Sequence, residues 1–173
     1  MKTALACWSV LAAFLGMAPN PLVAAAPAND RFSNRITLTG TNVTVPGSNA
    51  GATKETDEPD HAGNAGGSSV WWTWTSPNDG EVQITTDGSS FDTLLGVYTG
   101  TRVSSLTGVA SNDDHGLLPT SRLRFEASRG AEYQIAVDGY SDAMSIETGS
   151  IRLQLTFVKI GRASCRERVY VTV

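Results

Sequence analysis

Residues Ser68–Gly100 read SSVWWTWTSPNDGEVQITTDGSSFDTLLGVYTG. Apolar and polar side chains alternate along this stretch with a period of two, which is typical of half-buried β-strands and not of helices. In the segment 70–75 the alternation places Trp72 and Trp74 on one face of a strand and Trp71 on the opposite face. The stretch therefore predicts strands that bury at least one aromatic face.

Turn chemistry separates these strands from one another. The residues PNDG at 77–80 carry Pro where a turn begins and Gly where it ends. The segment 94–98 is apolar on both faces, which predicts a central strand covered on both sides. Further alternating segments lie at 36–39, 41–45, 81–85, 106–110, 122–126, 133–137 and 151–157, the first two forming one strand interrupted at Gly40. About eight short strands without a helix of any length predict an all-β fold, an antiparallel, jelly-roll-like β-sandwich in preference to a barrel.

The N-terminus has the layout of a secretory signal peptide. Lys2 is followed by an apolar run at 4–17 and then by small residues that end before Ala26. The apolar run is shorter than the ~20 residues that a membrane span needs. We therefore expect residues 1–25 to be removed on export to the cell surface or the extracellular space, with an uncleaved anchor as the alternative.

The C-terminal residues 159–173 are rich in Arg, unlike the acidic chain before them. The run IGRASCRERV at 160–169 resembles a translated sequencing-adapter read-through, so we predict a non-native or disordered tail. A natural basic tail for an anionic partner is the alternative. One domain is expected over residues 26–158.

The net charge of this domain limits the classes of partner that it can bind. Of 13 basic and 17 acidic side chains, 5 basic and 1 acidic lie outside residues 26–158, which leaves 8 against 16, a net charge near −8. Such a surface repels phosphate, so nucleic acid is not expected as a partner, and no membrane contact is expected once the signal is removed. Neither Cys lies in the domain, and a chain of this length can bury enough surface to fold without disulfides.

Acidic residues at the start of one strand and the end of another form the first candidate site. A hairpin that pairs Val97 with Leu106 would bring Asp92 beside the segment 112–114. Carboxylates this close repel one another, and calcium, with its ~6–8 oxygen ligands, offsets such repulsion. The candidate calcium ligands are Asp92, Asn112, Asp113 and Asp114. The alternative is ordinary turn chemistry without an ion, and Glu55 and Glu58 are weaker candidates.

Three segments resemble the bacterial pre-peptidase C-terminal domain: the stretch 69–100, SNDD at 111–114 and YQIAVDGY at 133–140. The resemblance covers about residues 29–157. It implies a β-sandwich that accompanies secreted peptidases and other extracellular proteins and is not itself an enzyme. Some related domains bind calcium, collagen or polysaccharide, and on this ground alone Asp30 is a further calcium ligand. No peptidase precedes the domain, so we expect the larger secreted protein to continue beyond residue 158.

Exposed aromatic side chains are candidates for binding an extracellular polysaccharide or protein polymer. Trp71 and Tyr140 are the two candidates, and the alternative for Trp71 is burial, either against the second sheet or beneath the Gly-rich loop 49–69. His61 and His115 lie outside any catalytic motif, and we expect both to be solvated.

The sequence therefore predicts a secreted, non-catalytic accessory or binding module, stabilised by calcium, that binds an extracellular glycan or collagen-like protein or assists secretion of an attached enzyme. A structural spacer or adhesin domain without a ligand, and a small hydrolase, are the alternatives.

Overall fold

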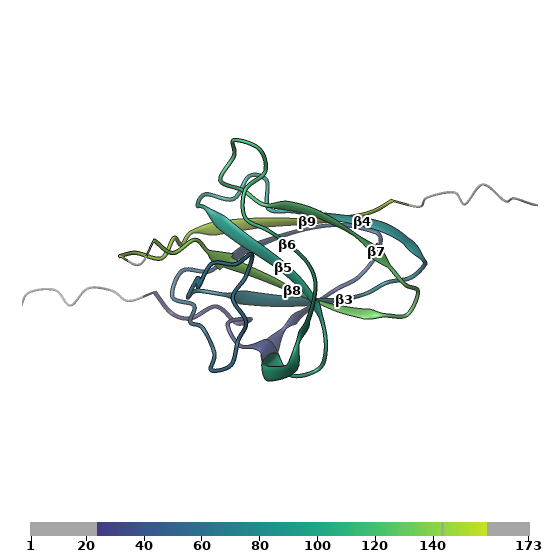
Figure 1. Ribbon diagram of the computed structural model, residues 1–173, viewed down its shortest axis with the longest axis horizontal. Helices are drawn as coiled ribbons and strands as arrows, with labels where there is room; N and C mark the ends of the chain where they lie inside the picture. The colour runs from purple at the N-terminus through teal and green to yellow at the C-terminus, as the bar shows by residue number, and fades with distance from the viewer. Residues whose placement is uncertain (1–23, 143, 159–173) are drawn as a thin grey trace, which may run out of the picture.

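The computed structural model describes residues 24–142 and 144–158, so the tail and nearly all of the predicted signal peptide lie outside the described residues. Nine strands form two packed sheets in this part of the chain (Figure 1). The five-stranded sheet contains, in spatial order, β1 (Ile36–Leu38), β3 (Val70–Thr75), β8 (Glu132–Gly139), β5 (Thr93–Thr99) and β6 (Thr107–Asn112). The four-stranded sheet contains β2 (Asn42–Ser48), β9 (Ser150–Val158), β4 (Gly80–Thr85) and β7 (Arg122–Ala127).

The only helical elements within the described residues are two short 3-10 turns, η1 (Phe32–Asn34) and η2 (Val103–Ser105). Across residues 24–142 and 144–158, no helix has the length and apolar character needed to cross a bilayer. The predicted all-β sandwich is therefore confirmed.

The chain changes sheets at Gly40, where a single interrupted strand was predicted. Gly40 has φ +103°, a backbone conformation that favours glycine, and it separates β1 in one sheet from β2 in the other. β1 pairs in parallel with β3, with Ile36 opposite Trp72, while the other ladders are antiparallel. The prediction of a single interrupted strand is thus wrong, and one parallel pair lies at the edge of an otherwise antiparallel sandwich.

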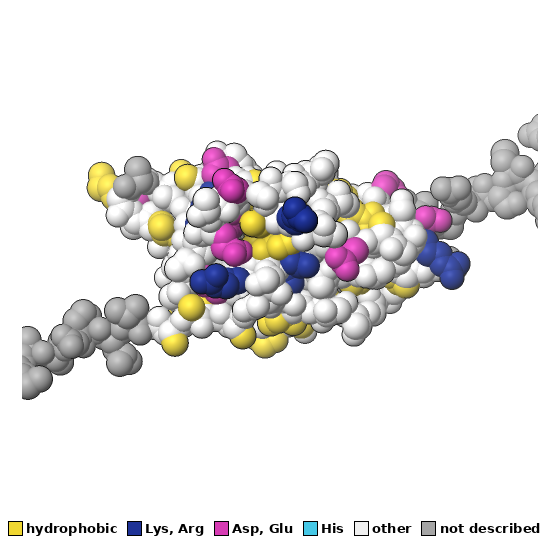
Figure 2. All heavy atoms as spheres, turned by 90° about the horizontal axis from the view of Figure 1, so that it is seen from below, with side chains coloured by type: hydrophobic (Ala, Val, Ile, Leu, Met, Phe, Trp, Pro, Cys, Tyr) yellow, Lys and Arg dark blue, Asp and Glu magenta, His cyan; other side chains and the backbone are white. Residues whose placement is uncertain are grey.

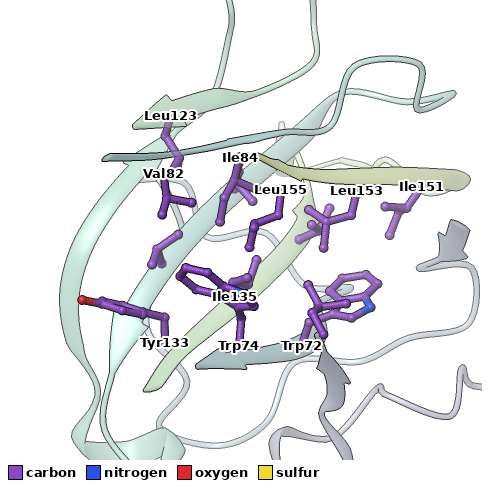
Figure 3. Packing of buried hydrophobic residues seen from close by; sticks show 14 of the residues in the cluster. Trp72, Trp74, Val82, Ile84, Leu123, Tyr133, Ile135, Ile151, Leu153 and Leu155 are labelled. Atoms are coloured by element: carbon purple, nitrogen blue, oxygen red, sulfur yellow. The ribbon is translucent and has the colours of Figure 1, made fainter. Parts of the chain in front are cut away.

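The main core lies between the two sheets. Figure 3 shows Trp72 and Trp74 of β3 pointing toward Leu153 and Leu155 of β9, as the alternation predicted. All four side chains are buried, and the indole N–H of Trp74 donates a hydrogen bond of 2.9 Å to the carbonyl of Gly40. This bond satisfies the polar atom of a buried ring and also anchors the crossover between the sheets.

A second layer covers the outer face of the five-stranded sheet. We call residues 49–69 the strap, because they run across this face together with the N-terminal segment 24–35 and the η2 turn (Figure 1). Phe32 of the N-terminal segment packs with Trp71 and Tyr98 of the sheet in a small aromatic cluster. Seen from below, this side carries acidic and basic side chains around a strip of apolar ones (Figure 2). β5 is therefore covered on both faces, as predicted.

One end of the strap is held by Asp138, a buried residue on the outer face of β8. Its carboxylate accepts hydrogen bonds from the backbone N–H groups of Gly67 and Ser68, the latter at 2.7 Å. A Cβ at Gly66 would lie 1.9 Å from the Asp138 carboxylate, and Gly66 has φ +55°. The two adjacent glycines therefore allow the strap to wrap closely around a buried charge.

The middle of the strap is held by His61, which is completely buried. Its Nδ1 lies 2.6 Å from the Tyr98 hydroxyl and its Nε2 lies 3.0 Å from a carboxylate oxygen of Glu58. A Cβ at Gly96 would lie 2.6 Å from that hydroxyl, so glycine at this position lets the Tyr98 ring lie flat enough to reach His61. The expectation that His61 is solvated is wrong, because the strap folds back onto the aromatic face of the sheet.

His61→Ala should lower the free energy of unfolding by about 3 kcal/mol, because it leaves the buried Glu58 carboxylate without its partner. His115→Ala is the matched control: His115 is half-buried, and its loss should change stability by less than about 1 kcal/mol. Urea unfolding of both variants measures the difference. Equal destabilisation of the two variants would show that the strap is not held by His61.

Candidate metal centre

The hairpin formed by β5 and β6 has a different register from the one predicted. Val97 pairs with Ala110 instead of Leu106, and a bulge interrupts the ladder between Val97 and Tyr98. The η2 turn lengthens the connection between the two strands, which shifts the pairing by four residues. The register prediction is therefore wrong, although Asn112 at the end of β6 still pairs with Leu95 near the start of β5.

Asp92, Asp113 and Asp114 nevertheless come together. One carboxylate oxygen of each lies within 4.8 Å of the others, and we call these three residues the acidic cluster. The chain after β6 folds back across the start of β5, where the backbone N–H of Thr93 donates to the carbonyl of Pro119 at 2.9 Å. The observed hairpin register, together with the chain that returns past Thr93, thus brings Asp113 and Asp114 beside Asp92.

Buried hydroxyl groups fix this loop in place. The Thr93 hydroxyl lies 2.6 Å from the Thr86 hydroxyl and 3.0 Å from that of Ser121. The backbone N–H of Ser121 donates to the Thr86 hydroxyl at 2.8 Å. All three residues are buried, so their hydrogen bonds tie the residue after β4 and the residue before β7 to the start of β5, directly beside Asp92.

Two oxygens of the acidic cluster have no hydrogen-bond donor. The Oδ1 atoms of Asp92 and Asp113 are buried and unpaired. Burial, with added repulsion from Asp113, Asp114 and Glu147, raises the pKa of Asp92 to about 6. Burial and repulsion from Asp114 also raise the pKa of Asp113. The fold therefore holds these carboxylates in an arrangement that favours a proton or a cation.

The other two predicted calcium ligands bind protein groups. Asn112 uses its side-chain oxygen to accept a hydrogen bond of 2.7 Å from the backbone N–H of Arg122. Asp30 accepts bonds from the N–H and hydroxyl of Thr53 at 2.6 and 3.2 Å, and is not one of the carboxylates gathered around Asp92. The carboxylates that the structure gathers are therefore three of the five predicted ligands, and Asn112 uses its oxygen within the protein.

The weaker candidates, Glu55 and Glu58, also face protein donors. Glu55 accepts a bond of 2.6 Å from the backbone N–H of Phe32, and Glu58 faces His61. Neither carboxylate is gathered with Asp92.

Glu147 is a neighbour of the acidic cluster that sequence reasoning missed. The loop between β8 and β9 passes beside Asp92, where the backbone N–H of Tyr140 donates to the Asp92 carbonyl at 2.9 Å and the N–H of Glu147 donates to the Tyr140 carbonyl at 2.9 Å. A Cβ at Gly139 would lie 1.7 Å from the carbonyl of Glu147. Gly139 is thus the sequence signal for this close approach, although it does not identify its partner.

The two predicted polymer-binding aromatics differ in exposure. Tyr140 is half-buried and lies next to the acidic cluster, because its backbone N–H donates to the carbonyl of Asp92. Trp71 is completely buried, with Phe32 and His61 packed edge-on at centroid distances of 5.1 and 5.5 Å. The prediction of an exposed Trp71 is therefore wrong, and its alternative, burial beneath the loop 49–69, describes the structure.

A second group of potential metal ligands consists of Glu58, His61 and Asp138, whose ligand atoms also lie within 4.8 Å of one another. Their polar atoms already bind Tyr98, each other or the backbone of the strap. This group is a structural network that anchors the strap. In the part of the chain that the structure describes, no hydrogen bond joins His115 to a serine, and its Nδ1 has no partner.

No family model matches the chain, and no curated protein matches it. Among solved structures, it is similar to the PliG periplasmic inhibitor of g-type lysozyme from Aeromonas hydrophila (14% identity, TM-score 0.47, 72% of this chain and 96% of that one). It is also similar to the pre-peptidase C-terminal domain of a Bacillus anthracis collagenase (15% identity, TM-score 0.40, covering 72% of this chain and 92% of that one). The PliG inhibitor from Salmonella Typhimurium is a third similar structure (7% identity, TM-score 0.38, covering 72% of this chain and 98% of that one).

Asp92→Asn should stabilise the calcium-free protein as the pH rises. The folded-state pKa of Asp92, about 6, lies above the ordinary value of about 3.9. The contribution of protonated Asp92 to the free energy of unfolding of the wild type is therefore fully present below about pH 4 and is lost as the pH rises through 6. Urea unfolding should show that the stability difference between variant and wild type shifts by about 1–2 kcal/mol in favour of Asn between about pH 4 and 7.5, allowing for partial hydration. A difference independent of pH would contradict this, and Glu126→Gln, an exposed carboxylate on β7, is the control.

Proposed function

We propose that this chain is an exported, non-catalytic accessory module whose acidic cluster binds a calcium ion. The observation that carries the proposal is the convergence of Asp92, Asp113 and Asp114 with two buried carboxylate oxygens that no protein group satisfies. A buried acceptor without a partner is unfavourable, and like charges add to that penalty. A bound cation removes both penalties.

The donor set suits calcium better than other common metals. Three carboxylates and Glu147 nearby supply hard oxygen ligands, and backbone carbonyls and water complete the ~6–8 ligands that calcium takes. The cluster contains neither His nor Cys, which zinc sites ordinarily use. Calcium also tolerates irregular geometry, as expected where ligands come from separate loops.

The ion would connect three parts of the fold at one end of the sandwich. Asp92 precedes β5, Asp113 and Asp114 follow β6, and Glu147 lies in the loop between β8 and β9. Binding would order these loops relative to one another, and Tyr140 lies in the same place. We propose that this ordered end contributes to binding an extracellular polymer, either a glycan or a collagen-like protein, or assists secretion of an attached enzyme.

The burial of Trp71 favours a second candidate function, a structural spacer or adhesin domain without a ligand. Such a domain needs only a stable sandwich and no exposed aromatic platform. Co-sedimentation with insoluble polysaccharides and with collagen separates the two functions, because the spacer remains in solution in every case.

Calcium should raise the free energy of unfolding by about 2.7 kcal/mol when its free concentration is 100 times its dissociation constant. Asp113→Asn and Asp114→Asn should each remove most of this gain, and Glu126→Gln should retain it. Calorimetric melting in calcium and then in EDTA at about pH 7.5 measures the gain. Near pH 5 it should shrink, because protons compete with the ion at Asp92.

An unchanged melting temperature in calcium, or an equal gain in wild type and Asp113→Asn, would contradict the calcium site. Isothermal titration of the wild type with calcium chloride provides an independent measurement of binding. Magnesium at the same concentration tests whether the oxygens select the larger ion.

A further inference from the structure

Exposed apolar side chains are concentrated in two loops at one end of the sandwich. These are the loop 113–121 between β6 and β7 and the loop 140–149 between β8 and β9. They carry four of the seven exposed large apolar side chains among the described residues: Leu117, Leu118, Met144 and Ile146. Leu117 is fully exposed and Met144 is 96% exposed. Single exposed apolar residues are common on protein surfaces, but four in two neighbouring loops indicate an interaction surface.

Hydrogen bonds order the tip of the first loop. The backbone N–H of Leu118 donates to the carbonyl of His115 at 3.2 Å, and the N–H of His115 donates to the carbonyl of Thr120 at 2.9 Å. Gly116 has φ +70°, a left-handed conformation that lets the chain reverse within two residues. The turn therefore presents Leu117 at its apex, and a loop that is already ordered loses little conformational entropy when it binds a partner.

The acidic cluster lies between the bases of these two loops. Two consecutive residues hold the loops in place: the carbonyl of Asp92 accepts from the N–H of Tyr140, and the N–H of Thr93 donates to the carbonyl of Pro119, both at 2.9 Å. Figure 1 shows both loops projecting from the sandwich near the start of β5. An apolar loop tip therefore lies on each side of the site proposed for calcium.

The charged side chains of the two loops are all acidic. The loops contain neither Lys nor Arg, and their acidic residues are Asp113, Asp114, Asp142 and Glu147. An anionic surface repels this end of the sandwich when no cation is present. A calcium ion at the acidic cluster offsets that repulsion. Of the ~6–8 ligands that calcium takes, those that water would supply can instead be oxygens of an anionic partner.

A lipid bilayer fits these features better than a folded protein does. The apolar tips belong to separate loops, and a protein partner would need a surface that matches the shape of both. The interface of a bilayer is fluid and accepts separate apolar side chains, which reach the boundary of the acyl chains. The lipid phosphate groups lie just outside that boundary, where they can face an ion at the base of the inserted loops.

We propose that, with calcium bound, this end of the sandwich docks on an anionic phospholipid bilayer, where Leu117, Leu118 and Met144 insert and lipid phosphate oxygens bind the ion. Both contacts are needed, because a few inserted apolar side chains alone give only weak, reversible binding. The sequence predicted no membrane contact from the net charge of the domain, and calcium removes that obstacle at this end. The inference rests on the calcium site of the proposed function, but not on the proposed polymer.

The test is co-sedimentation of the intact chain with vesicles. One kind contains phosphatidylcholine and phosphatidylglycerol in equal amounts, and the other contains phosphatidylcholine alone. In calcium chloride the mixed vesicles should retain the wild type, and EDTA should release it, because the acidic loops are then repelled. Vesicles of phosphatidylcholine alone should retain little protein in either condition.

Substitutions at the loop tips test the insertion. The double variant Leu117→Asn, Leu118→Asn should bind the mixed vesicles about a hundredfold more weakly, about tenfold for each leucine that no longer enters the acyl boundary. Met144→Asn should bind about tenfold more weakly. Ile36→Asn is the matched control, because Ile36 is an exposed apolar residue at the opposite edge of the five-stranded sheet, and its binding should match that of the wild type.

The outcomes separate this inference from the calcium site. A rise in melting temperature in calcium without retention on the mixed vesicles would overturn the membrane contact and leave the calcium site intact. Retention that survives EDTA, that is equal on both kinds of vesicle, or that the double leucine variant leaves unchanged would also overturn it. If calcium has no thermal effect and no vesicle retains the chain, both proposals are contradicted.

A second copy of the chain is the other occupant that the experiment can detect. Calcium-dependent self-association in analytical ultracentrifugation, lost in the double leucine variant and found without retention on vesicles, would place that copy on the loops and overturn the membrane contact. Melting temperatures in EDTA confirm that each variant is folded.

Discussion

The structure depends on the burial of both faces of the five-stranded sheet. Its inner face packs against the other sheet, as sandwiches require, but its outer face also carries buried side chains, including Trp71 and Tyr98. Polar groups on that outer face, Asp138 above all, must then find partners inside the protein. The strap supplies the donors to Asp138 from its own backbone, so a loop without regular secondary structure becomes part of the core.

The acidic cluster shows the opposite situation at one end of the same sheet. There the protein supplies no hydrogen-bond donor to the buried oxygens of Asp92 and Asp113. Asp138, by contrast, accepts hydrogen bonds from the backbone N–H groups of Gly67 and Ser68. Burial desolvates the carboxyl groups of both Asp92 and Asp138, yet only Asp138 is compensated by hydrogen bonds from backbone N–H groups. This contrast within one fold supports the proposal of a cation at the cluster, because the same sheet provides backbone donors to a buried carboxylate at Asp138 and none to Asp92.

Much of the fold could be predicted from local patterns. Alternation identified the inward face of β3 and the double burial of β5, since both depend only on which side of a strand a residue occupies. The register of β5 and β6 could not be predicted, because it depends on the length of a connection that contains η2. The convergence of Asp92 and Asp113 was predicted through that wrong register, and it holds because the observed register, with Asn112 opposite Leu95, also brings the end of β6 to the start of β5. The burial of His61 depends on tertiary contacts of the strap, which no local pattern reports.

Covering one sheet and leaving the other bare restricts where a ligand can bind. On the covered side the aromatic rings that could stack on a sugar are used to hold the strap, and freeing them would expose Asp138 and Glu58 without partners. A ligand on that side would therefore have to offset the loss of buried hydrogen bonds before gaining any contact. The four-stranded sheet carries no such penalty, because its outward side chains, apart from the buried Thr85, are exposed or half-buried. A ligand on that face would therefore leave the core undisturbed.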